Sequence, residues 1–127
     1  MQNIYKILFL DDDTQITNVV SDFFKGSRLD IWACNDPDEA ITYLKSNQVD
    51  CIITDLKMPK LNGLLFFNKV RDEICVKTPG ILLSGDINQE VKEEAKNVGL
   101  GAVFEKNLNP SQFEQKIIDF IEKNSMS

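Results

Sequence analysis

The chain contains no histidine, and this absence excludes several kinds of active site. A Ser-His-Asp or Cys-His catalytic pair and a His-ligated zinc site all need an imidazole. Any phosphohistidine chemistry must therefore come from another protein. The three cysteines, Cys34, Cys51 and Cys75, form no C-x-x-C motif and are odd in number. We expect reduced thiols that pack as small apolar side chains, not disulfides.

Basic residues are outnumbered as well, with 14 lysines and arginines against 20 acids and a net charge of −6. This balance argues against direct binding to nucleic acid or to an anionic membrane. No apolar run approaches the roughly 20 residues that span a bilayer. Residues 7–10 run straight into three acids, so we expect no signal peptide either. The expected location is the cytoplasm.

What the chain does contain is a regular alternation of short apolar runs and amphipathic segments. Its 127 residues suit one domain with one core, which we place at about residues 4–122, with a frayed tail at 124–127. The pattern predicts five βα units, with strands at residues 6–10, 29–34, 51–54, 80–83 and 102–104. Such a pattern is typical of an α/β fold whose parallel sheet is covered by helices on both faces.

Several local signals mark where helices begin and end. Asp36 is expected to cap a helix that has Pro37 in its first turn. Gly26 is expected directly after the cap of the first helix, and Gly63 is expected to supply a positive φ in a turn. The spacing of apolar residues predicts that the first helix buries a stripe made of Ile16, Val19, Val20, Phe23 and Phe24.

Functional sites of open parallel sheets lie at the carboxyl ends of the strands. In this chain those ends carry Asp11 and Asp12, then Asp55, Ser84 and Lys106. Carboxylates that meet from two strands repel one another, and without a cation at least one would have its pKa raised. A hard divalent ion removes this conflict, and Mg²⁺, with Mn²⁺ as a substitute, suits a few carboxylates plus a phosphoryl oxygen.

The two remaining polar residues at this edge complete a set for phosphoryl chemistry. Lys106 offers a fixed positive charge and Ser84 a hydroxyl donor, both of which stabilise charge on phosphoryl oxygens. Asp55 is the best candidate nucleophile because it lies between the acidic pair and these two residues. Taken alone, Ser84 would be an ordinary turn residue and Lys106 a surface lysine. For Asp13 we prefer the role of a helix cap.

These positions resemble the receiver (CheY-like) domain of two-component response regulators. The matching residues are Asp11-Asp12, Asp55 with Met58-Pro59 and Gly63, Ser84-Gly85, and Lys106, and the resemblance covers about residues 4–122. It implies a single receiver domain over residues 1–127 with a doubly wound, flavodoxin-like (βα)₅ fold. The implied five-stranded parallel sheet has the strand order 2-1-3-4-5.

The resemblance also implies a role for each site residue. Asp55 would be the phosphoacceptor, with Ser84 and Lys106 contacting the phosphoryl group. Asp12 would bind Mg²⁺ directly, Asp11 partly through water, and the backbone carbonyl of Lys57 would be a third protein ligand.

The chain would then be a signalling switch and not an enzyme. Its partners would be a sensor histidine kinase or histidine phosphotransfer protein, and a downstream output domain or partner protein. Members of this family often form dimers through the face made by the last two helices and the strand between them, so the resemblance implies a possible homodimer through that face.

Some positions depart from the family pattern. Asn107 stands where a proline, often cis, usually follows the lysine, and we expect a trans Lys106–Asn107 bond, favoured by about 2.5–4 kcal/mol. Val103 stands where the family has Tyr or Phe, so the coupling between Asp55 and the far face is expected to differ. Lys57 and Asp86 flank the site with opposite charges and could form an ion pair across its mouth.

Two other functions remain open from the sequence. One is a degenerate receiver that binds partners without being phosphorylated. The other is a haloacid-dehalogenase-like phosphatase, which needs a D-x-D-x-T/V motif; residues 11–15 supply the acids but end in Gln15. Whether the module stands alone or belongs to a larger regulator also remains open.

Overall fold

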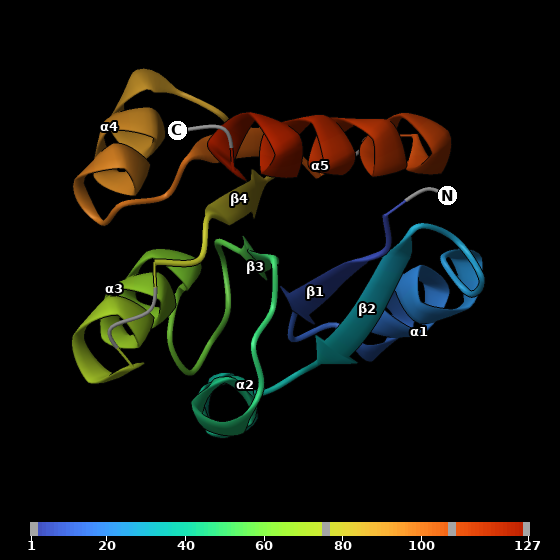
Figure 1. Cartoon of the computed structure of the whole chain (residues 1–127). Helices are drawn as coiled ribbons and strands as arrows, with labels where there is room; N and C mark the ends of the chain where they lie inside the picture. Colours follow the sequence, from blue (N-terminus) through green and yellow to red (C-terminus); the bar gives the residue numbers. More distant parts are fainter. Residues whose placement is uncertain (1–2, 75–76, 107–108, 126–127) are drawn as a thin grey trace.

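The computed structural model describes residues 3–74, 77–106 and 109–125, where five strands alternate with five helices (Figure 1). The strands are β1 (Tyr5–Leu10), β2 (Leu29–Cys34), β3 (Cys51–Asp55), β4 (Gly80–Ser84) and β5 (Ala102–Glu105). The helices are α1 (Thr14–Phe23), α2 (Pro37–Ser46), α3 (Gly63–Ile74), α4 (Gln89–Asn97) and α5 (Pro110–Ser125).

The strands form one parallel sheet of order β2-β1-β3-β4-β5. This confirms the doubly wound, flavodoxin-like fold. Leu10 lies opposite both Cys34 and Thr54, while Ser84 lies opposite Glu105, so the carboxyl ends of the strands share one edge. The chain order reverses between β1 and β3, and ligands of such sheets bind at that switch point.

The sheet separates two apolar cores. Leu8 and Leu10 face the core shared with α2, α3 and α4, whereas Ile7 and Phe9 face the core shared with α1 and α5. All four side chains are buried. An unbroken apolar run is what a strand covered on both faces requires. The five strands of the structure begin and end within one residue of the predicted positions, which are therefore confirmed.

The predicted inner face of α1 is only partly correct. Phe24 is buried, and Ile16 and Val20 pack against the core, but Val19 and Phe23 are 62% and 50% exposed. These two residues line a groove between α1 and the start of α5, where no residue of the described ranges covers them. The buried residue of α1 is instead the polar Thr17.

Two of the predicted helix signals also work differently from expectation. Phe24 is the C-cap of α1, so Gly26, with φ +76°, lies two residues past the cap and not directly after it. Asp36 is the N-cap of α2, but its carboxylate makes no cap hydrogen bond. It pairs with the Lys60 ammonium at 3.1 Å instead.

The end of α5 lies further along the chain than expected. The helix continues to Ser125, and the Asn124 amide donates to the Phe120 carbonyl at 2.7 Å. The fraying expected at 124–127 stays a prediction. Residues 126 and 127 lie outside the described part.

The thiols and the helix lengths complete the fold. Cys34 and Cys51 are buried free thiols, as expected, and burial raises the pKa of Cys34 to about 12. Cys75 lies outside the described residues. Within the described ranges, no helix has the length and apolar character of a membrane span.

Candidate functional site

Three carboxylates meet at the carboxyl edge of the sheet, as the sequence predicted. Asp11 follows β1, Asp12 follows Asp11, and Asp55 is the last residue of β3. One oxygen from each lies within 4.8 Å of the others. Asp11 is fully buried and Asp55 is 4% exposed, while Asp12 is open to solvent.

Hydrogen bonds fix the orientation of Asp11. Its backbone N–H donates to the Cys34 carbonyl at 3.1 Å, and its Oδ1 accepts from the Asp13 backbone N–H at 2.9 Å. The buried Oδ2 has no hydrogen-bond partner among the described residues. The same oxygen does lie 3.3 Å from the Lys106 ammonium, so its contact is an ion pair without hydrogen-bond geometry. A buried carboxylate oxygen beside two further carboxylates suits a hard cation such as Mg²⁺, which binds through oxygen ligands.

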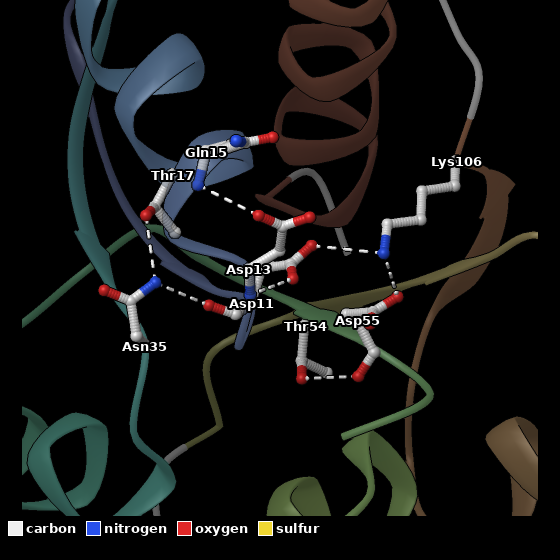
Figure 2. Close-up of polar contacts among 8 residues, drawn as sticks. All are labelled: Asp11, Asp13, Gln15, Thr17, Asn35, Thr54, Asp55 and Lys106. Carbon is white, nitrogen blue, oxygen red and sulfur yellow. Dashed lines mark hydrogen bonds and ion pairs between the residues drawn. The ribbon is translucent and has the colours of Figure 1, made fainter. Parts of the chain in front are cut away.

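Lys106 reaches this cluster from the end of β5 (Figure 2). Its Nζ lies 3.1 Å from Asp55 Oδ1 and 3.3 Å from Asp11 Oδ2. Burial lowers the pKa of Lys106, but its hydrogen bond to Asp55 and the charge of Asp11 outweigh burial and raise that pKa overall. Lys106 therefore stays protonated at neutral pH.

One ammonium does not balance the cluster. Burial raises the pKa of Asp55, against the opposing effect of Lys106, and the charge of Asp12 raises it further. Burial likewise raises the pKa of Asp11, and the charge of Asp55 adds to this effect. The charge of Asp12 thus makes Asp55 harder to ionise, the charge of Asp55 does the same to Asp11, and a divalent cation would relieve this repulsion.

The first residue of α3 packs directly against the acidic strand tip. A Cβ at Gly63 would collide with the Asp55 main-chain oxygen and would lie 3.0 Å from the Leu82 side chain. The positive-φ glycines of the described chain are Gly26 and Gly99, so the expectation of a positive φ at Gly63 is wrong. Glycine is needed there because α3 approaches the backbone of β3 so closely.

Ser84 lies at the end of β4, where it was expected, but its hydroxyl is engaged elsewhere. The Oγ donates to the Asp86 carbonyl at 2.7 Å and accepts from the Asp86 backbone N–H at 3.2 Å. The side chain is 2% exposed. Its one hydroxyl proton is therefore used within the β4–α4 turn.

The residues that flank the site or depart from the family pattern agree only in part with the expectations from the sequence. No ion pair joins Lys57 and Asp86 in the described chain, so the proposed pair across the mouth is wrong. Both side chains are exposed, where an ion pair gains little. Val103 is partly buried and packs against the core shared with α2, α3 and α4. The Lys106–Asn107 bond lies outside the described residues.

The structure adds two residues that sequence reasoning missed, Asn35 and Thr17. In the sequence, the residues after β2 indicate only the helix cap at Asp36. In the structure, the Asn35 carboxamide donates to the Asp11 carbonyl and to the Thr17 hydroxyl. The available signal was a polar residue at the carboxyl end of a strand that neighbours β1.

The chain is similar to known proteins over most of its length. The family model of the response regulator receiver domain matches residues 7–118. ARR21 of Arabidopsis thaliana is 30% identical over 116 residues, which are 90% of this chain and 18% of that protein. The transcriptional regulatory protein CrdR of Helicobacter pylori is 22% identical over 115 residues, which are 91% of this chain and 54% of that protein.

A solved structure agrees with these matches. Chemotaxis protein CheY4 of Vibrio cholerae superposes with a TM-score of 0.86 and 28% identity, covering 92% of this chain and 98% of that one. By contrast, the chain spans only 13% to 54% of the length of the first curated relatives that it matches.

Proposed function

The chain belongs to the response regulator receiver domain family, and on this premise we propose that Asp55 accepts a phosphoryl group from a phosphohistidine of another protein. The observation that carries this proposal is the position of Asp55. It is a buried carboxylate at the tip of β3, 3.1 Å from the Lys106 ammonium and beside two further acids. The absence of histidine in the chain agrees with a donor in another protein.

The acids of the site fit a divalent ion. We propose that Asp11, Asp12, Asp55 and the main-chain carbonyl of Lys57 hold Mg²⁺, with Mn²⁺ as a substitute. The gathering of three carboxylate oxygens within 4.8 Å of one another, with the Lys106 ammonium as their cationic neighbour, supports this assignment. When bound, the ion would offset the charge of the carboxylates and of the phosphoryl oxygens.

The remaining residues act on the phosphoryl group. A carboxylate oxygen of Asp55 forms the new O–P bond while the N–P bond to the donor breaks. The electron pair of that bond stays on the imidazole nitrogen, which then takes up a proton. Lys106 pairs with a phosphoryl oxygen, and Ser84 exchanges its bond to the Asp86 carbonyl for one to the phosphoryl group.

The partners follow from the same proposal. The donor would be a sensor histidine kinase or a histidine phosphotransfer protein. Phosphorylation would shift an existing equilibrium of the α4–β5–α5 face, which would bind an output domain, a partner protein or a second copy. The greater length of the curated relatives supports a role in a larger regulator.

The alternatives gain no support. Asp13 caps α1 through its carboxylate, which accepts from the Gln15 backbone N–H at 2.9 Å, so it is not free to act as the second acid of a phosphatase motif. The complete set of Asp11, Asp12, Asp55, Ser84 and Lys106 disfavours a degenerate receiver.

Acetyl phosphate with Mg²⁺ tests the proposal. We expect intact-mass and peptide analysis to find one phosphoryl group on Asp55, none without the metal, and none in Asp55→Asn. The matched control is Asp86→Asn, which removes an exposed carboxylate near the site and should still be modified. A wild-type chain that takes up no phosphoryl group would instead support the degenerate receiver.

A further inference from the structure

Asn35 lies directly after β2 and immediately before the N-cap of α2, outside the residues proposed to bind the metal or the phosphoryl group. Its Nδ2 donates to the main-chain carbonyl of Asp11 at 2.8 Å and to the Thr17 hydroxyl at 2.9 Å. Figure 2 shows the Asn35 carboxamide pointing to Asp11 from the side opposite Lys106. Both amide protons of the side chain are therefore used at the β1–α1 turn.

Thr17 extends this contact into α1. Its hydroxyl accepts from Asn35 and donates to the Thr14 carbonyl at 3.1 Å. It is the buried residue of a helix whose apolar side chains Val19 and Phe23 stay exposed. A polar residue in the most buried position of a helix is expected to make specific hydrogen bonds, and here they lead back to the acidic turn.

Together these bonds hold the Asp11 main chain on both sides. Its N–H donates to the Cys34 carbonyl at 3.1 Å and its carbonyl accepts from Asn35, so two consecutive residues at the end of β2 grip it. The Asp11 carbonyl belongs to the peptide unit that leads into Asp12. The exposed Asp12 side chain depends on that peptide for its position, whereas the Asp11 side chain is also held by the Asp13 N–H.

From this geometry we infer that Asn35 is a positioning residue for the metal site: it fixes the peptide between Asp11 and Asp12 so that both carboxylates face Asp55. The inference rests on the proposed function, because it concerns how the acids bind the proposed ion. Groups that orient metal ligands without touching the metal typically contribute about 10–100-fold to its affinity. Thr17 assists by fixing the orientation of the Asn35 carboxamide.

The test is the Mg²⁺ affinity of the full chain, measured by isothermal titration calorimetry without any phosphodonor. Asn35→Ala should weaken binding about tenfold or more. Thr17→Val, which keeps the shape and removes the hydroxyl, should weaken it in the same direction, and Thr17→Ser should restore wild-type affinity. The matched control is Asn47→Ala, because the Asn47 amide also donates to a main-chain carbonyl, that of Tyr43 at 2.9 Å, far from the acids.

The outcomes separate the inference from the function on which it rests. If the wild type binds Mg²⁺ and folded Asn35→Ala binds it equally well, the inference is wrong and the proposed function stands. If the wild type binds no Mg²⁺, the proposed metal site is wrong and the inference fails with it. If Asn35→Ala does not fold by circular dichroism, Thr17→Val decides: unchanged affinity overturns the inference, and weaker affinity that Thr17→Ser restores supports it.

Discussion

Two halves of the site lie on neighbouring strands but are organised differently. The acceptor half, Asp11, Asp12 and Asp55, already has its carboxylates gathered within 4.8 Å of one another. The readout half, Ser84 and Val103, has its hydroxyl bonded within its own turn and its valine packed into the core. Under the proposed function, the acceptor half is thus arranged for phosphoryl transfer before any donor binds, whereas the Ser84 hydroxyl would have to exchange its hydrogen bond to contact the phosphoryl group.

The halves also differ in electrostatics. The acceptor half contains two buried carboxyls, those of Asp11 and Asp55, whose pKa values are raised chiefly by burial. Ser84 is neutral, and its hydroxyl donates one hydrogen bond and accepts another. Lys106 connects the two halves, because its backbone N–H donates to the Ser84 carbonyl at 3.1 Å while its ammonium pairs with Asp11 and Asp55. The unbalanced charge therefore lies in the half that is proposed to bind the metal and the phosphoryl group.

The largest expected effect comes from removing Lys106. Lys106→Met should slow phosphorylation of Asp55 by acetyl phosphate about 10²–10³-fold at saturating Mg²⁺, because the charge beside the phosphoryl oxygens is lost. Intact-mass spectrometry over time measures the rate. Ser84→Ala, from the readout half, should slow it less. Equal losses in the two variants would show that the halves are not distinct in the chemical step.

Substitutions at two glycines, one beside each half of the site, test how tightly the two halves are packed. Gly63→Ala should lower the free energy of unfolding by about 1–3 kcal/mol, since the new methyl group would collide with the Asp55 carbonyl oxygen. Gly85→Ala, beside Ser84, places its methyl in open space and should stay within about 0.5 kcal/mol. Urea denaturation measures both. A Gly85→Ala variant as unstable as Gly63→Ala would contradict the difference in packing.

The raised pKa of Asp55 predicts a pH dependence of stability in the metal-free chain. Above pH 3.8, the ordinary pKa of an Asp side chain, the unfolded chain releases a proton that the folded chain keeps. The protonated Asp55 therefore contributes its full stabilisation below pH 3.8, and this contribution is lost as the pH rises through the higher folded pKa. Asp55→Asn should flatten that fall and raise the free energy of unfolding at neutral pH by about 1–2 kcal/mol.

Urea denaturation at several pH values, with a chelator present, measures this effect. Asp86→Asn is the control from the β4–α4 turn, since its carboxylate is exposed. A wild-type slope that Asp55→Asn leaves unchanged would mean that the charge of Asp55 is already balanced.

The smallest effect is expected at the mouth of the site. Lys57 is exposed and forms no pair with Asp86 in the described chain, so Lys57→Ala should change the free energy of unfolding by less than about 0.5 kcal/mol. It should also leave the lifetime of the aspartyl phosphate and the Mg²⁺ affinity unchanged, because alanine keeps the main-chain carbonyl. If Lys57→Ala and Asp86→Ala both shortened the lifetime of the aspartyl phosphate, that result would support an ion pair between these two residues.

The sequence predicted the acceptor half better than the readout half. The run Ile7–Leu10 and the Asp55 strand could be found because a strand buried on both faces has a simple apolar pattern, and parallel strands bring their ends together. The orientation of the Ser84 hydroxyl could not, because it depends on a choice between hydrogen-bond partners in the folded chain.

The same limit explains the other differences. The exposure of Val19 and Phe23 depends on how α5 lies beside α1, and periodicity does not encode the distance between two helices. The reason for glycine at Gly63 is the approach of α3 to β3, and the role of Asn35 follows from the adjacency of β2 and β1.

Backbone amide NMR tests the separation of the two halves most directly, with Mg²⁺ added first and beryllofluoride second. The Asp86 amide donates to Ser84 Oγ, so its shift reports whether that hydroxyl has moved. We predict that Mg²⁺ alone shifts the amides of Asp11, Asp12 and Asp13, and that the Asp86 amide shifts only when beryllofluoride binds Asp55. An Asp86 amide that stays unmoved when the adduct has formed, or that moves fully with Mg²⁺ alone, would contradict the account.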